Sequence, residues 1–185
     1  MIDPVAVWHA EHVRFASLLD FIEQQMGAFH EGKDPDYRLM YDVVHYLHHY
    51  ADCYHHPRED VAFARLVGRE PALRLSINRL LQEHRVLEAT GHTLLAHLDD
   101  ILGDRVIERA IVEAAAATYL VYFRHHLAME EREVLPHAGR ALKPEDWAAV
   151  AAAVPAVPDP LFGDAAGERY RELRKWMNSR PAREP

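Results

Sequence analysis

The chain has 185 residues and a formal net charge of −8, from 21 Lys and Arg against 29 Asp and Glu, with histidine counted as neutral. This length suits one domain, or one domain with an appendage, and an apolar content of 49% indicates a globular fold rather than disorder. The acidic balance, without any basic run, argues against a nucleic-acid partner, and a single cysteine excludes a disulfide framework. The histidines, 14 in number, are the feature of the composition that needs an explanation.

The first residues show no basic stretch followed by an apolar stretch, so they do not resemble a secretory signal peptide. No apolar run approaches the roughly 18 residues that a membrane-spanning helix needs. We therefore expect a cytoplasmic protein that binds neither membranes nor nucleic acid.

Glycine and proline divide most of the chain into long blocks whose apolar residues recur at helical spacing. The expected helices cover residues 3–25, 35–67, 71–102 and 104–135. Pro57 lies inside the second block and should kink it, and Pro136 should end the fourth. No block alternates apolar and polar residues as a strand would. Four helices with short connections predict an all-α fold, an up-down four-helix bundle.

Residues 141–185 differ from the blocks before them. A short helix should begin at Lys143 and continue through Trp147, a proline-rich loop should follow, and residues 164–177 have the pattern of an amphipathic helix. We therefore divide the chain into the bundle, residues 1–140, and a short helical C-terminal appendage that packs on the bundle and frays at its end. The appendage would serve as a lid or as a contact in a homodimer.

A pattern of histidine and acidic residues occurs twice along the chain. Glu-His pairs lie at residues 11–12 and 83–84, which are 72 positions apart. After a further 42 or 43 positions each half has a histidine, then a glutamate four positions later, then a second acid: His55, Glu59 and Asp60 in one half, His126, Glu130 and Glu131 in the other. The halves therefore look like a duplicated helical hairpin, and an antiparallel bundle can bring them face to face.

A histidine and a glutamate four residues apart share one face of a helix, so the pair can offer two donors to one cation. With 14 histidines and 16 glutamates, chance gives about one such pair. The chain has three such pairs: His55 with Glu59, His84 with Glu88, and His126 with Glu130. Imidazole and carboxylate donors suit iron, manganese or zinc, and carboxylates can bridge two metals. The Glu-x-x-His spacing of ferritin-type sites and the His-Glu-x-x-His spacing of zinc proteases do not occur.

The ordered set of motifs resembles the hemerythrin-like family with its HHE cation-binding domain, over roughly residues 3–140. The resemblance is carried by Glu11-His12, the run from His55 to Asp60, Glu83-His84, and the run from His126 to Glu130 that closes at Leu135-Pro136. Members of that family are four-helix bundles with a non-haem di-iron centre inside the bundle. The resemblance implies six metal ligands, of which the two glutamates would bridge the ions: His12, His55, Glu59, His84, His126 and Glu130.

Glu88 is the position at which this sequence departs from the oxygen-carrying members of the family, which have a second histidine there in the third helix. Some bacterial relatives have a glutamate, so Glu88 is a candidate seventh ligand, and the alternative is a solvated residue on the helix surface. The resemblance implies two iron ions, Fe2+ or Fe3+, with an oxo or hydroxo bridge, and manganese or zinc as alternatives. A third carboxylate favours the ferric state, so we rank reversible oxygen carriage below redox, peroxide-related, sensing or iron-handling roles.

The sequence thus predicts a di-iron protein that binds or reacts with dioxygen, peroxide or nitric oxide, or that senses or handles iron. The alternative is a regulatory or interaction module that a metal stabilises and that has no turnover. No arrangement of nucleophile, base and orienting residue is apparent, so neither a catalytic residue nor an organic cofactor is assigned. Whether the protein is an enzyme stays open.

Further histidines lie close to these motifs in the sequence. His56 is a rival to His55 on the second helix, and His125 is the corresponding rival on the fourth. His48 and Asp52 lie within two turns before His55. They could hydrogen-bond to a ligand imidazole, or they could simply form the polar end of the bundle.

Overall fold

A computed structural model describes residues 3–162 and 168–179, and in this part of the chain every regular element is helical and no strand occurs. The first elements are α1 (Pro4–His30), α2 (Tyr37–Tyr46), the π-helix η1 (Leu47–His55), α3 (His56–Arg69) and the 3₁₀ turn η2 (Pro71–Leu73). They are followed by α4 (Arg74–Leu102), α5 (Arg109–Met129), a second π-helix η3 (Glu130–Val134) and α6 (Leu135–Ala141). The predicted all-α class is confirmed. Among the described residues, no helix combines the length and the apolar character that crossing a membrane requires.

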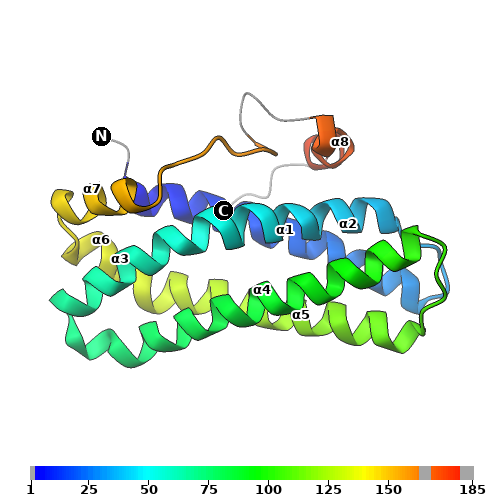
Figure 1. Ribbon diagram of the computed structural model, residues 1–185, viewed down its shortest axis with the longest axis horizontal. Helices are drawn as coiled ribbons and strands as arrows, with labels where there is room; N and C mark the ends of the chain where they lie inside the picture. Colours follow the sequence, from blue (N-terminus) through cyan, green and yellow to red (C-terminus); the bar gives the residue numbers. More distant parts are fainter. Residues whose placement is uncertain (1–2, 163–167, 180–185) are drawn as a thin grey trace.

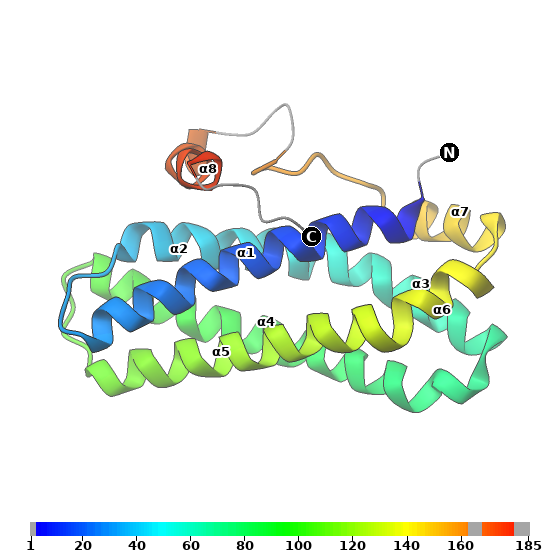
Figure 2. The same ribbon diagram turned by 180° about the vertical axis from the view of Figure 1, so that it is seen from behind.

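The long helices lie side by side along the longest axis of the molecule (Figure 1 and, from behind, Figure 2). α2, η1 and α3 follow one another without a break, and so do α5, η3 and α6. α4 packs against both α2 and α5, and α1 also packs against both α2 and α5. The facing sides of these helices therefore enclose a common interior.

Pro57 and Pro136 each lie in the first turn of a helix, where the missing backbone N–H costs no hydrogen bond. Pro57 is the second residue of α3 and Pro136 is the second residue of α6, and a π-helical segment precedes each helix. The sequence prediction that Pro136 ends the fourth helix is wrong, because α6 continues to Ala141. At Pro57 the irregularity is the π-helix η1, and the chain stays helical through it.

Two other helix ends differ from the prediction. α1 continues past Gly27 to His30, and a Cβ at Gly27 would meet no atom within 4 Å. α5 begins at Arg109 instead of near residue 104, because Asp104 has a φ of 59° in the left-handed region, which a right-handed helix cannot include. The turn between α4 and α5 is therefore longer than the sequence pattern predicts.

Two apolar cores lie on either side of a polar layer, which is formed by buried histidine and glutamate side chains such as His12, Glu59, His84 and His126. We call the cluster of buried side chains that contains Phe15 the large core, and the cluster that contains Trp8 the small core. His12 lies between Trp8 and Phe15 along α1, so this helix passes from the small core through the polar layer into the large core. The other long helical segments also pass from one core through the polar layer into the other core. Their polar residues are Glu59, His84 and His126.

α7 (Pro144–Ala153) packs against α3 and is longer than the short helix predicted there. The Asp146 carboxylate accepts a hydrogen bond from the backbone N–H of Lys143, at 2.9 Å, and another from Nε of Arg69, at 2.7 Å. One carboxylate therefore fixes the start of α7 and ties it to α3.

η4 (Glu168–Tyr170) and α8 (Arg171–Asn178) form the last described helical segment, and α8 packs against α2. The Tyr170 hydroxyl lies 2.8 Å from Nδ1 of His45, a residue of α2. The start of the predicted last helix, at residue 164, and the predicted frayed end beyond residue 179 lie outside the described residues.

The partly buried contact of His45 predicts a loss of stability in acid. Burial and the nearby Arg169 lower the pKa of His45 from 6.5 to about 4, so the unfolded chain takes up a proton at this residue more readily than the folded chain. The free energy of unfolding should therefore fall between about pH 6.5 and about pH 4, more steeply in the wild type than in His45→Gln. Urea unfolding at pH 7 and pH 5 measures this difference. A His30→Gln control at an exposed position should follow the wild type, and an equal acid loss in His45→Gln would contradict the prediction.

Candidate metal centre

Four buried histidines form two pairs whose Nε2 atoms converge. Nε2 of His12, on α1, lies 2.9 Å from Nε2 of His55, the last residue of η1. Nε2 of His84, on α4, lies 3.1 Å from Nε2 of His126, on α5. Two nitrogen donors at about 2.1 Å from one metal and at right angles to each other are separated by roughly 3.0 Å. The separations within both pairs therefore suit neighbouring ligands of a single cation.

Two carboxylates span the two histidine pairs. Glu59 places Oε1 3.2 Å from Nε2 of His55 and Oε2 3.7 Å from Nε2 of His84. Glu130 places Oε2 3.3 Å from Nε2 of His126 and 3.5 Å from Nε2 of His12. Both side chains are 0% exposed, and none of their four oxygens has a hydrogen-bond partner among the described residues. Burial of unpartnered carboxylate oxygens is costly, and a cation between the pairs would supply what they lack.

The two glutamates are in electrostatic conflict with each other. Burial alone would raise the pKa of Glu59, but His55 and His12 outweigh it and hold this pKa well below its usual value. Burial and the charge of Glu59 together raise the pKa of Glu130. Without a cation, one carboxylate is therefore ionised while the other is driven toward its neutral form. A divalent ion beside both would remove this conflict.

The histidines divide into two kinds by their pKa. Burial opposes protonation of His12 and His84, but their carboxylate neighbours outweigh it and raise the pKa of each to about 10. Burial and the neighbouring His84 and His56 hold the pKa of His126 well below its usual value. Because a ligand imidazole must be neutral, a metal ion has to displace the protons of His12 and His84.

Each of the four histidines has a carboxylate at its other ring nitrogen, Nδ1. Hydrogen bonds join Nδ1 of His12 to Glu131, of His55 to Glu11 and of His84 to Asp60, each at 2.7 Å, whereas Glu83 approaches Nδ1 of His126 to 3.4 Å without a hydrogen bond. A carboxylate at Nδ1 fixes the proton on that nitrogen, orients the ring and leaves the Nε2 lone pair for a metal. Three of the four rings, those of His12, His55 and His84, are therefore oriented by the protein itself.

The repeat found in the sequence explains these partners. The glutamates of the two Glu-His pairs, Glu11 and Glu83, each serve a histidine of their own half. The second acids, Asp60 and Glu131, each serve a histidine of the opposite half. Sequence reasoning included all four acids in the repeat but assigned them no role, because spacing along the chain does not say which helices are neighbours.

A π-helix lies beside the cluster of histidines and glutamates in each of two continuous helical stretches, α2–η1–α3 and α5–η3–α6. The N–H of His56 bonds to the carbonyl of Ala51, and the N–H of Leu135 bonds to the carbonyl of Glu130, each five residues back. His55 ends η1 and Glu130 begins η3, so each π-helix contains one residue of the polar layer. Insertions of this kind are frequent at functional sites because they change which side chains face the interior.

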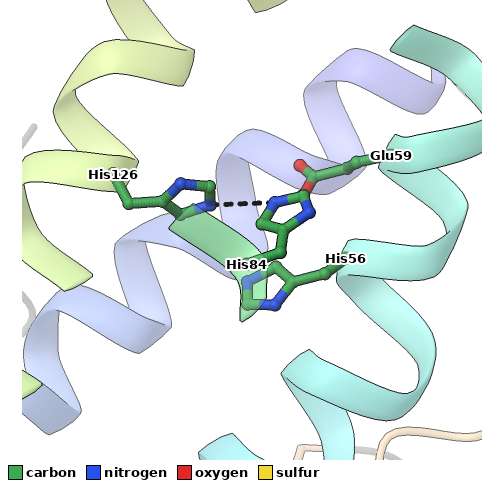
Figure 3. Close-up of side chains that lie close together, drawn as sticks. All are labelled: His56, Glu59, His84 and His126. Atoms are coloured by element: carbon green, nitrogen blue, oxygen red, sulfur yellow. Dashed lines mark hydrogen bonds and ion pairs between the residues drawn. The ribbon is translucent and has the colours of Figure 1, made fainter. Parts of the chain in front are cut away.

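The donors fall into two groups in which the ligand atoms all lie within 4.8 Å of one another: His12, His55 and Glu59, and His56, Glu59, His84 and His126. Figure 3 shows the second group, with His56 and Glu59 projecting from α3 toward His84 and His126 approaching from α5. His56 was only a rival to His55 in the sequence analysis, yet both are buried here. His125 is different, because its side chain is 43% exposed and Nε2 lies 2.6 Å from an Arg79 guanidinium nitrogen.

Glu88 lies outside both groups. Its side chain is exposed, on the wall of a pocket of about 350 Å³ that is also lined by Asp52, His56 and His84. Six of the seven predicted ligands are thus brought together in the buried layer, and Glu88 is beside it.

The carboxylate of Glu11 provides a test of the Nδ1 contacts. Glu11→Gln keeps the size of the side chain but removes the charge that holds His55, so the affinity for the metal should fall about 10- to 100-fold. Competition with a chelator of known affinity measures this loss. Glu23→Gln, at an exposed position of the same helix, is the matched control and should bind metal like the wild type. Equal affinities for Glu11→Gln and the control would show that the contact does not matter for binding.

Comparison with known proteins identifies a family for this arrangement. The family model described as Hemerythrin HHE cation binding domain matches residues 3–138, which include the two histidine pairs, the two carboxylates that span them and the four acids near Nδ1. No curated protein and no solved structure gives a significant match. The match covers well over half of the chain, and the chain therefore belongs to the Hemerythrin HHE cation binding domain family.

Proposed function

We propose that this protein is a non-haem di-iron protein, built on the up-down four-helix arrangement of its family. The proposed ligands are His12 and His55 for one ion, His84 and His126 for the other, with Glu59 and Glu130 bridging both. The observation that supports it most directly is the pair of buried carboxylates without hydrogen-bond partners, each within 3.7 Å of both histidine pairs. In proteins such carboxylates are expected only where a charge compensates them.

The donor set favours a redox-active metal. Four neutral imidazoles with two carboxylates suit iron, with manganese or zinc as alternatives. When bound, a pair of iron ions supplies sites for dioxygen, peroxide or nitric oxide and can change its oxidation state. The chain limits what can approach, because the rings of Phe15 and Phe123 close the layer on the side of the large core; Phe15 lies edge-on to His55 with ring centroids 5.0 Å apart. This closed side favours small ligands, and the pocket lined by His56 and His84 is the side from which they would approach.

Metal analysis tests the proposal directly. Protein purified from iron-replete cells should contain two iron ions per chain and show ligand-to-metal charge-transfer absorption in the near ultraviolet. Less than one transition-metal ion per chain, after anaerobic addition of ferrous iron as well, would refute it. Two ions of zinc or manganese in place of iron would refute the identity of the metal and keep the dinuclear site.

The proposed small-ligand chemistry needs a separate experiment. The anaerobic ferrous protein is mixed with nitric oxide, with dioxygen or with hydrogen peroxide, and the absorption spectrum is followed in time. A spectral change that saturates at a fixed ratio of ligand to protein would support binding or reaction at the centre. An unchanged spectrum with all three would leave the protein as an iron-binding protein without this chemistry.

A second candidate function is a regulatory module, and a chain of contacts between the C-terminal appendage and the centre favours it. Asp159 accepts a hydrogen bond from the Tyr46 hydroxyl at 3.1 Å, and the Tyr46 ring stacks on Tyr50 with centroids 5.5 Å apart. The Tyr50 hydroxyl donates to Glu11 at 2.9 Å, and Glu11 holds His55. Through these contacts a change at the metal would alter how the segment around Asp159 packs against α2. Iron-dependent binding of a partner without turnover would favour this function, and turnover of peroxide or dioxygen by the isolated protein would favour an enzyme.

A further inference from the structure

Three buried tyrosines form a line of neighbouring rings that begins beside the polar layer and ends in the C-terminal appendage. Tyr50, a residue of η1, is stacked on Tyr46, the last residue of α2, with an interplanar angle of 13° and centroids 5.5 Å apart. Tyr46 in turn lies edge-on to Tyr170, the last residue of η4, with centroids 5.8 Å apart. Both separations are typical of packed aromatic pairs, and an electron can pass between rings that are this close.

Each of the three hydroxyls lies within hydrogen-bond distance of a group that can accept its proton. The partners are Glu11 for Tyr50 (2.9 Å), Asp159 for Tyr46 (3.1 Å) and Nδ1 of His45 for Tyr170 (2.8 Å). Burial raises the pKa of all three tyrosines, so each phenol holds its proton at neutral pH. A phenol that loses an electron becomes a strong acid, so its oxidation is easier where a neighbouring base takes the proton in the same step.

The carboxylate of Glu11 connects this line of tyrosines to the proposed metal centre. One of its oxygens accepts the hydrogen bond from Tyr50, and the other lies 2.7 Å from Nδ1 of His55. Tyr119 of α5 provides the contrast, because it is also fully buried and packs on Phe123, but its hydroxyl has no hydrogen-bond partner among the described residues. A buried tyrosine of this bundle is therefore not in general equipped to lose a proton, and the three in the line are.

We propose that Tyr50, Tyr46 and Tyr170 form a relay that carries oxidising equivalents from the metal centre to the C-terminal appendage. This proposal rests on the proposed di-iron function and adds electron transfer through the chain to it. A reductant that is too large to reach the buried layer would then supply electrons at the appendage.

Hydrogen peroxide is the oxidant that the relay would serve. Its reduction to two molecules of water takes up two electrons and two protons, and the protons come from solvent. When the proposed iron ions are already ferric, both electrons come from the chain: each leaves Tyr50 as its O–H bond breaks and the proton moves to Glu11. Tyr46 and Tyr170 replace the two electrons, and Tyr50 takes its proton back from Glu11. One molecule of peroxide thereby leaves two neutral radicals, on Tyr46 and Tyr170, with their protons on the two acceptors described above.

EPR spectroscopy of the full chain loaded with iron tests the relay. The ferric protein is mixed with one equivalent of hydrogen peroxide and frozen, and the signal of tyrosyl radicals is integrated. The wild type should give this signal, with at most two radicals per chain, and Tyr50→Phe should lose it, although the variant keeps the ring and the contact between Glu11 and His55. Tyr119→Phe is the matched control and should give the wild-type signal. The iron content of every variant is measured first, so that a loss of metal is not mistaken for a loss of the relay.

Asp159→Asn provides a second variant, which keeps all three rings and every proposed metal ligand. It removes the acceptor for the proton of Tyr46, so the radical should stay on Tyr50, with at most one per chain and with the line shape found in Tyr46→Phe. An equal signal in Tyr50→Phe and the wild type, or no tyrosyl signal in a wild type that binds two iron ions, would overturn the relay and leave the dinuclear site intact. A wild type that binds no iron would instead refute the proposed function.

Discussion

Glu59→Gln is expected to reduce the iron content from two ions per chain to less than one. Glu59 approaches both histidine pairs and is fully buried, so its replacement by a neutral amide removes one donor charge from each proposed ion. The remaining carboxylate, Glu130, cannot compensate two cations alone. Elemental analysis after anaerobic reconstitution with ferrous iron and removal of excess metal measures the content.

Two control variants make this experiment specific. Glu172→Gln changes an exposed glutamate of α8 and should leave the iron content unchanged. Glu88→Gln tests the predicted seventh ligand, since a loss of iron in this variant would place Glu88 at the metal and full content would leave it on the pocket wall. Two ions per chain in Glu59→Gln would contradict the bridging role of Glu59.

Removal of the metal is expected to lower the unfolding temperature by about 5–10 °C. A ligand present at a hundredfold excess over its dissociation constant stabilises the folded state by about 2.7 kcal/mol. In a chain of this size each kcal/mol corresponds to about 2–4 °C. The metal-free protein also has to keep Glu59 and Glu130 buried next to each other, so the polar layer is its weakest part. Calorimetric scans before and after chelation and dialysis measure the shift.

The same scans on Glu59→Gln separate this effect from a general effect of the chelator. The variant should show a much smaller shift on chelation, because it has less metal to lose. Its metal-free form should unfold at a lower temperature than the metal-free wild type, because His12 and His55 lose the buried carboxylate that holds them. An unfolding temperature of the wild type that does not depend on metal would contradict the prediction.

The helical class could be predicted from the sequence because apolar residues at helical spacing depend only on neighbours along the chain. The paired motifs could be predicted for the same reason, since His55 with Glu59 and His126 with Glu130 each lie on one helix face. Helix ends were less predictable. Pro136 normally ends a helix, but the π-helix η3 before it places it in the first turn of α6, and no local pattern in the sequence signals this.

His56 shows why part of the site could not be predicted. Adjacent residues of a helix point about 100° apart, so the sequence analysis treated His55 and His56 as rivals for one inward position. In the structure their helix lies between two others, and both positions face inward: His55 lies against His12 of α1, and His56 lies against His84 of α4. Which two neighbours a helix has is a property of the tertiary fold.

Carboxylates that connect the two halves of the repeat should couple the binding of one metal ion to the binding of the other. Asp60 belongs to the first half and orients His84 of the second, and Glu131 of the second half orients His12 of the first. Glu59 and Glu130 each approach both histidine pairs, so a cation bound by one pair immobilises carboxylates that the ion at the other pair also needs. Loading of the two positions should be cooperative and, as linkage requires, each ion should strengthen the binding of the other by the same factor. A single hairpin of the duplicated pattern has an incomplete donor set and lacks the acid from the opposite half that orients its first histidine.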